Sequence, residues 1–142
     1  MDVQSIEMVE VSPRDGLQNE KHPVATADKL TLIERAIAAG VRRIEVTSFV
    51  NPRAVPQMAD AEDVCAGLPD RADVTYIGLV MNERGATRAL ATGRIDQLGA
   101  VAVATDAFAM ANQGQTSDGS VEAAAAIVSL ARSAGRTGQV TI

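Results

Sequence analysis

Two hydrophobic patterns alternate along the chain. Short apolar or alternating runs predict strands, and apolar side chains that recur every three or four positions predict helices. The expected strands span residues 6–11, 41–47, 74–80, 97–104 and 138–142, and three of the expected helices lie at 57–66, 83–92 and 120–133. The first expected helix carries Leu30, Ile33, Ile37 and Ala38 on one face. Thr26 or Asp28 can cap the first helix, and Gly40 can close it. Residues 106–119 are expected to form a polar loop. Together, the expected strands and helices make up four βα units and a fifth strand.

Alternating strands and helices predict a parallel α/β sheet with right-handed crossovers. For a chain of 142 residues, an open doubly wound sheet is the default architecture. However, neither G-x-G-x-x-G nor G-x-x-x-x-G-K-[ST] follows any expected strand, so the signature of a nucleotide-binding sheet is missing. An eight-unit barrel is the other architecture for this pattern, and it needs about 250 residues. Because Val140-Thr141-Ile142 begins an apolar strand without a terminal cap, we expect a truncated domain.

Composition narrows the class of protein. Hydrophobic residues make up 46% of the chain and charged residues 22%, which is ordinary for a soluble globular domain. The formal net charge of -5 and the lack of basic clusters argue against nucleic acid and anionic membranes as partners. The single cysteine permits no internal disulfide, and no apolar run reaches about 18 residues. We therefore expect a soluble, cytoplasmic protein.

Arg14 and Asp15 stand side by side just after the first expected strand. Pro13 cannot donate to a strand ladder, so the strand is expected to end there. In parallel α/β proteins, the loops beyond the carboxyl ends of the strands hold ligands and catalytic groups. The carboxylate could bind a hard divalent cation, and the guanidinium could polarise a substrate oxygen. From the residues alone, a turn with a solvated arginine and aspartate remains the alternative.

Two longer blocks resemble the hydroxymethylglutaryl-CoA lyase family. The first is Ser12-Pro13-Arg14-Asp15-Gly16-Leu17-Gln18-Asn19-Glu20, and the second is Ile44-Glu45-Val46-Thr47-Ser48-Phe49-Val50, followed by Pro52 and Val55-Pro56-Gln57-Met58. Related metal-dependent barrels share Arg-Asp-Gly, but the flanking residues and the Thr-Ser-Phe-Val block point to the lyase branch. The resemblance implies a parallel (β/α)8 TIM barrel. Residues 1–142 would be the N-terminal part of its single catalytic domain, comprising about four βα units and a fifth strand.

The resemblance also implies a reaction and a cofactor. The family cleaves 3-hydroxy-3-methylglutaryl-CoA to acetyl-CoA and acetoacetate by a metal-assisted retro-Claisen reaction. Asp15 would bind the catalytic Mg²⁺ or Mn²⁺, and Arg14 would stabilise the enolate that forms at the thioester carbonyl. The implied partner is an acyl-CoA substrate, and the full-length enzyme is expected to be a homo-oligomer, namely a dimer.

Four more residues become candidates through the resemblance. Glu45 is expected in the active site, where pairing with Arg14 would compensate its charge. Gln18 and Ser48 are expected near the substrate, with a surface amide and a strand-closing hydroxyl as the alternatives. Asn112 is a weaker candidate for substrate contact, because a loop asparagine often caps a turn. The segment around Asn112 departs from the Asn-Ile-Asn element of the family, which leaves a longer 3-hydroxy-3-alkylglutaryl-CoA or another acyl-CoA open as the substrate.

Two residues are not expected to act in catalysis. His22 lies in a loop, whereas the family's metal-binding histidines form a His-x-His pair that this sequence does not contain. Cys65 falls within the second expected helix and is expected to be a small buried hydrophobic residue. Two other functions stay open: a Claisen-type synthase or aldolase of the same superfamily, and a non-catalytic half-barrel that binds metal only weakly.

Overall fold

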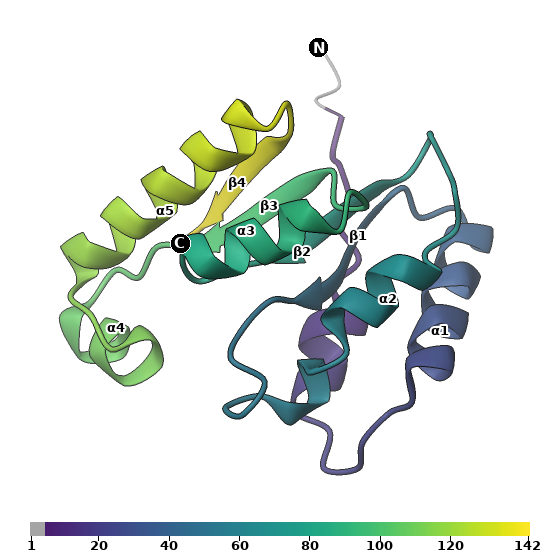
Figure 1. Cartoon of the computed structure of the whole chain (residues 1–142), viewed down its shortest axis with the longest axis horizontal. Helices are drawn as coiled ribbons and strands as arrows, with labels where there is room; N and C mark the ends of the chain where they lie inside the picture. Colours follow the sequence, from purple (N-terminus) through teal and green to yellow (C-terminus); the bar gives the residue numbers. More distant parts are fainter. Residues whose placement is uncertain (1–4) are drawn as a thin grey trace.

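A computed structural model of the chain describes residues 5–142 and shows a four-stranded parallel sheet flanked by helices (Figure 1). The strands are β1 (Arg43–Ser48), β2 (Thr75–Leu79), β3 (Gln97–Val101) and β4 (Thr137–Thr141). The α-helices are α1 (Thr26–Ala38), α2 (Ala61–Gly67), α3 (Glu83–Ala91), α4 (Asp106–Gln113) and α5 (Ser117–Ser133). The expected α/β class is confirmed, and the element boundaries agree with the predicted ones to within a few residues, except in the three segments that follow.

The strands lie in the order β1-β2-β3-β4, and every neighbouring pair is parallel. A doubly wound sheet reverses its strand order at a switch point, whereas each strand of a barrel is followed by its next neighbour. Within residues 43–141 the order does not reverse. The sheet therefore has the topology of a barrel wall. None of the helices within residues 5–142 combines the length and the apolar character that a bilayer span requires.

The hydrophobic core lies between the sheet and the helices. Both faces of β1 and β2 are buried, so β1 places the polar side chains of Glu45, Thr47 and Ser48 in the interior together with Ile44 and Val46. Aliphatic side chains provide nearly all of this core, as expected from an aromatic content of only 2%. Its fully buried members include Ile33, Ile44, Val64, Leu98 and Ile127.

The prediction of a strand at 6–11 was wrong. Only Glu10 pairs with the sheet: its N–H donates to Arg43 O over 2.9 Å, and its carbonyl accepts from the Glu45 N–H over 2.8 Å. Ile6 and Met8 are 95% and 75% exposed, so no layer covers the apolar face that would hold a longer strand in place. A short π-helical turn, Ser12–Gly16, follows this single bridge.

Two other segments also differ from the prediction. The expected helix at 57–66 is divided into a 3₁₀ turn, Pro56–Met58, and α2. The expected loop at 106–119 contains all of α4 and the start of α5. Thr105 accepts the Phe108 N–H at the start of α4, and Thr116 accepts the Gly119 N–H at the start of α5. Gly114, at φ 67°, ends α4 between these caps.

Gly78 in β2 gives a test of this packing. A Cβ at Gly78 would lie 2.9 Å from Cε2 of the buried Phe49 ring. We therefore expect Gly78→Ala to lower the free energy of unfolding by about 1–3 kcal/mol, measured by urea denaturation. Gly99→Ala in β3 is the matched control, because a Cβ there would meet its nearest neighbour, Ile77, at an ordinary 3.5 Å. Equal stabilities of the two variants would contradict this packing.

Candidate functional site

Arg14 is the centre of a charged network at the start of the chain. Its Nε forms an ion pair with the carboxylate of Glu45, and its Nη1 lies 2.8 Å from Oδ1 of Asp15. The same Nη1 donates a long hydrogen bond of 3.5 Å to Oε1 of Gln18. The Arg14 side chain is only 17% exposed, whereas the Asp15 side chain is 60% exposed. The turn at Ser12–Gly16 therefore presents the guanidinium and the carboxylate together.

Glu45 anchors this network from within the sheet. The residue lies in β1 and is 5% exposed, so its charge requires a partner, which Arg14 provides. The expected pairing of Glu45 with Arg14 is thus confirmed. Its Oε2 would lie 3.6 Å from a Cβ at Gly99, so a glycine in β3 leaves open space beside the carboxylate. Glu45 pairs with the guanidinium of Arg14 from the buried side, and Asp15 pairs with it from the exposed side.

A cavity of about 860 Å³ adjoins this network. It lies at the carboxyl ends of the strands, because its lining includes residues that follow β1 and β2 and the last residue of β3. Four predicted site residues line it: Arg14, Asp15, Gln18 and Asn112. Apolar side chains, among them Leu79, contribute much of the remaining wall. The two segments that carry these four residues are far apart in the sequence, and the fold brings them to one cavity.

The structure places the other two predicted residues differently. Glu45 lies beneath Arg14 and does not belong to the cavity lining. Ser48 is fully buried at the end of β1, and its Oγ is an orphaned hydroxyl without a hydrogen-bond partner in the described part of the chain. Asn112 lies in the last turn of α4, so its expected position in a loop was wrong. It is exposed and faces the same cavity as Asp15.

Asp15 suits one position in the ligand set of a hard divalent cation. Its carboxylate is accessible, and the amide oxygens of Gln18 and Asn19 line the same cavity. Within residues 5–142, no group of three or more histidine, cysteine, aspartate or glutamate side chains is arranged to hold a metal. The residues therefore fit one part of a metal site, and a cation held by this chain alone would keep most of its water ligands.

Gln57 is a structural partner of the site to which the sequence pattern gave no role. Its Oε1 accepts the Val24 N–H over 2.9 Å, and its Nε2 donates to the carbonyls of Glu20 and His22 over 3.3 and 3.0 Å. Gln57 thereby fixes the loop that connects the Arg14 turn to α1. No local sequence signal could have identified this role, because the partners of Gln57 lie more than 30 positions away.

Cys65 in α2 is fully buried, as expected for a small hydrophobic residue. Burial raises the pKa of its thiol to about 12, because the apolar surroundings disfavour the thiolate. We expect the folded protein not to react with a thiol-specific disulfide reagent at pH 8, whereas the urea-unfolded protein should react fully. Rapid labelling of the folded protein would contradict the packing of α2.

Comparisons with known proteins agree with these observations. The HMGL-like family model matches residues 5–142. A 3-hydroxy-3-isohexenylglutaryl-CoA/hydroxymethylglutaryl-CoA lyase of Pseudomonas aeruginosa is 47% identical over 107 residues, which are 75% of this chain and 35% of that protein. The crystal structure of the HMG-CoA lyase from Brucella melitensis superimposes with a TM-score of 0.90 at 39% identity, over 97% of this chain and 48% of that one.

A third relative was solved with a ligand. The structure of an HMG-CoA lyase from Acinetobacter baumannii in complex with coenzyme A and 3-methylmalate matches with a TM-score of 0.83 at 38% identity, over 93% of this chain and 43% of that one. The chain thus spans less than half the length of these relatives. Over that part it has the fold of the hydroxymethylglutaryl-CoA lyase TIM barrels, as the sequence predicted. The chain belongs to the HMGL-like family, whose hydroxymethylglutaryl-CoA lyases are its relatives.

Proposed function

We propose that this chain carries the Arg14 and Asp15 half of a carbon–carbon lyase site that cleaves 3-hydroxy-3-methylglutaryl-CoA, or a close homologue, to acetyl-CoA and a 3-oxo acid. The observation that supports this most directly is the position of Arg14, which is held by buried Glu45 and faces a large cavity at the carboxyl ends of the strands. Family membership and the lyase names of the relatives support the same reaction class.

Arg14 has the geometry needed to stabilise a developing oxyanion. In the cleavage, the C3 hydroxyl loses its proton, the C2–C3 bond breaks, and its electron pair moves onto the thioester carbonyl oxygen. A guanidinium beside that oxygen stabilises the enolate, which then takes up a proton to give acetyl-CoA. Because Glu45 already orients Nε of Arg14, the guanidinium need not reorganise as charge develops. Nη1 is the atom that donates to both Asp15 and Gln18.

Asp15 is the residue of this chain that would hold a divalent cation, with Gln18 beside it. When bound, Mg²⁺ or Mn²⁺ would supply Lewis acidity that lowers the cost of ionising the tertiary hydroxyl. Arg14 donates to the same carboxylate over 2.8 Å and so fixes its orientation. Asn112 faces the cavity from α4, where its amide could donate to a carbonyl or hydroxyl of the substrate.

The size of the alkyl group at C3 of the substrate is a separate question, because the cavity wall also contains apolar side chains from three elements. These are Leu79 of β2, Val101 of β3 and Phe108 of α4. The Pseudomonas aeruginosa relative is named for both an isohexenyl and a methyl substrate. We include a longer 3-alkyl chain in the proposed substrate class for this reason.

The experiment uses a chimera in which this chain replaces the matching segment of the Pseudomonas aeruginosa relative. Product analysis by mass spectrometry after incubation with Mg²⁺ should show acetyl-CoA together with acetoacetate from the methyl substrate. The ratio of kcat/KM for the isohexenyl and methyl substrates then defines the preferred alkyl group. A chimera that condenses an acyl-CoA with a 3-oxo acid without cleaving the product would favour the synthase or aldolase alternative.

A further inference from the structure

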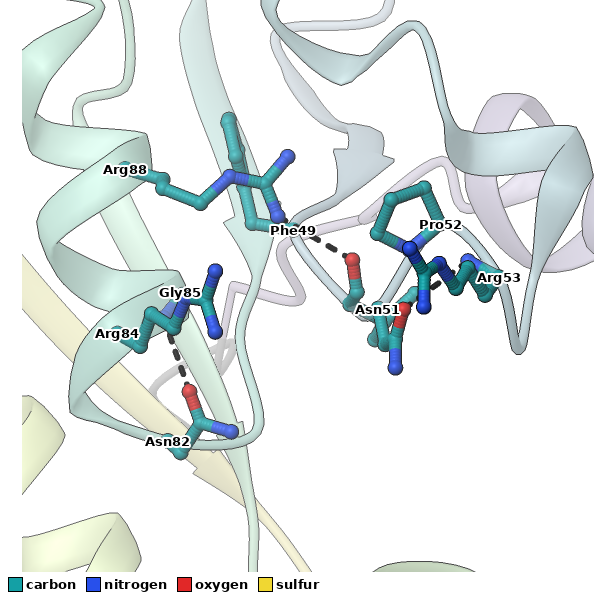
Figure 2. Close-up of a pocket in the computed structure, with 9 residues that line it drawn as sticks. Phe49, Asn51, Pro52, Arg53, Asn82, Arg84, Gly85 and Arg88 are labelled. Carbon is teal, nitrogen blue, oxygen red and sulfur yellow. Dashed lines mark hydrogen bonds between the residues drawn. The ribbon is translucent and has the colours of Figure 1, made fainter.

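A second cleft, of about 590 Å³, lies between the loop after β1 and the first turns of α3. Three arginines line it: Arg53 from the loop, and Arg84 and Arg88 from α3. Figure 2 shows Arg53 on one side of the opening, with the two helical arginines on the other. No carboxylate belongs to this lining, although the whole chain carries a net charge of -5. The cleft is therefore a local concentration of positive charge on an acidic protein.

Among the described residues 5–142, an acidic partner neutralises only one of the three arginines. Arg88 forms a bidentate pair with Glu62 over 2.8 and 3.0 Å, donates to Val50 O over 3.2 Å, and lies 5.8 Å from the Phe49 ring centre. Within residues 5–142, neither Arg53 nor Arg84 has an acidic side chain within 4 Å in the structure. Both are exposed. Arg88 is a fixed wall of the cleft, and the other two guanidinium groups remain available.

The position of Arg84 is electrostatically unfavourable unless an anion is present. Arg84 and Arg88 are four residues apart on α3, and like charges at this spacing destabilise a helix by about 0.2–0.5 kcal/mol. Arg84 also lies in the first turn, where the positive end of the helix dipole repels a cation. A bound anion would offset both repulsions, because it would be attracted to the Arg84 guanidinium and to the positive end of the helix dipole.

The two walls of the cleft are held in a fixed relation. A Cβ at Gly85 would approach Phe49 O to 2.8 Å, so glycine is needed for α3 to pack this closely against the loop after β1. Asn82 caps α3 by accepting the Gly85 N–H over 2.9 Å. On the opposite wall, Asn51 Oδ1 accepts the Arg53 N–H over 3.0 Å, as the dashed lines in Figure 2 indicate. The cleft is thus preformed.

The arginine cleft is continuous with the cavity beside Arg14 and Asp15. Val50, Asn51 and Asn82 line both. One elongated molecule could therefore place its acyl end near Arg14 and its phosphate-bearing end between Arg53 and Arg84. We propose that this arginine cleft binds the phosphate-bearing end of the acyl-CoA substrate, with Arg53 and Arg84 as the phosphate ligands and Arg88 as a fixed positive wall. The proposal rests on the proposed function, since it assumes an acyl-CoA in the neighbouring cavity.

Calorimetric titration of the protein with coenzyme A, 3′-dephospho-coenzyme A and pantetheine tests this proposal. Arg53→Ala and Arg84→Ala should each raise the Kd of coenzyme A about tenfold, because each removes a charge-assisted hydrogen bond to phosphate. Neither variant should change the binding of pantetheine, which has no phosphate. Arg84→Lys should retain part of the affinity, since it keeps the charge but loses the planar fork.

Arg35→Ala is the matched control, because it removes the same charge from the exposed surface of α1. It should leave all three affinities unchanged, and every variant should keep the wild-type melting temperature. An unchanged Kd of coenzyme A in both cleft variants would overturn the proposal. The proposal would also be overturned if inorganic phosphate bound in the cleft and coenzyme A did not displace it, because the cleft would then be a site for free phosphate.

The titration separates this proposal from the proposed lyase function. Arginine-dependent binding of coenzyme A in a chimera that cleaves nothing would support the cleft and contradict the lyase reaction. Conversely, cleavage with an unchanged KM in the Arg84→Ala chimera would support the lyase and contradict the cleft.

Discussion

Replacement of Arg14 by lysine is expected to lower kcat of the chimera by about 10²–10³, the usual loss when one oxyanion-stabilising donor is removed. Arg14 contacts Glu45 through Nε and both Asp15 and Gln18 through Nη1. A lysine has a single ammonium at the end of a flexible stem, so it cannot hold Glu45 and direct a second donor into the cavity at once. KM should change less than kcat, because the lost interaction strengthens as the enolate forms. Steady-state kinetics with 3-hydroxy-3-methylglutaryl-CoA measures both parameters.

Arg43→Lys is the control for this experiment. Arg43 also lies in the region of β1 and forms an exposed pair with Glu7 over 2.7 Å, but it does not line the cavity beside Arg14. Its substitution should leave kcat within about twofold of the parent chimera. A normal kcat in Arg14→Lys, with the charge kept and the fork lost, would exclude the proposed role of the guanidinium.

Replacement of Glu45 by glutamine is expected to cost about 3 kcal/mol of unfolding free energy, because it leaves a half-buried guanidinium without its buried anionic partner. The glutamine keeps the size of the side chain, so the loss reports charge rather than packing. Urea denaturation monitored by circular dichroism measures this difference in the chain itself. In the chimera, kcat should also fall, since Glu45 orients Arg14.

Glu62→Gln provides the matched control, because Glu62 also pairs with an arginine, Arg88, but its side chain is 47% exposed. That exposed pair should contribute about 1 kcal/mol or less. The Arg14→Met/Glu45→Gln double variant should be less destabilised than the sum of the single variants, since the two residues share one interaction. Additive losses would show that Glu45 stabilises the strand for a reason other than Arg14.

The sequence predicted which residues come together at the site better than it predicted the elements that carry them. Arg14, Asp15, Gln18 and Asn112 do line one cavity, and Glu45 does pair with Arg14. The roles of these residues in catalysis stay predictions. The pattern itself could identify Arg14 and Asp15 because the Arg-Asp-Gly block is short and local, whereas Gln18, Glu45 and Asn112 became candidates only through the family resemblance. Ser48 shows the limit of this reasoning: its position was predicted, but the burial of its hydroxyl depends on tertiary packing.

The errors in the fold have local physical causes. The alternation at 6–11 is typical of a strand, yet within these residues only Glu10 pairs with the sheet. The polar composition of 106–119 concealed α4, although the threonines at 105 and 116 were available as helix caps. The arginine cleft could not be predicted, because no pattern in the sequence shows that the loop carrying Arg53 packs against α3.

The non-catalytic alternative depends on how much of a metal site this chain provides. In the described residues, the chain provides one candidate metal ligand at the cavity rim and no cluster of three. The exposed apolar side chains of Phe108, Met110 and Val121 lie on α4 and α5, and Val140 is 43% exposed on β4. The chain spans less than half the length of these relatives, so activity must be measured where the remaining part of a relative is present.

The most direct test of the central claim is the kcat of the chimera for Mg²⁺-dependent cleavage of 3-hydroxy-3-methylglutaryl-CoA, measured beside the unmodified Pseudomonas aeruginosa relative. If this chain carries the Arg14 and Asp15 half of a lyase site, the chimera should reach a kcat within about tenfold of that relative. A chimera that has the melting temperature and circular dichroism of a folded barrel but shows no cleavage above background would contradict the claim.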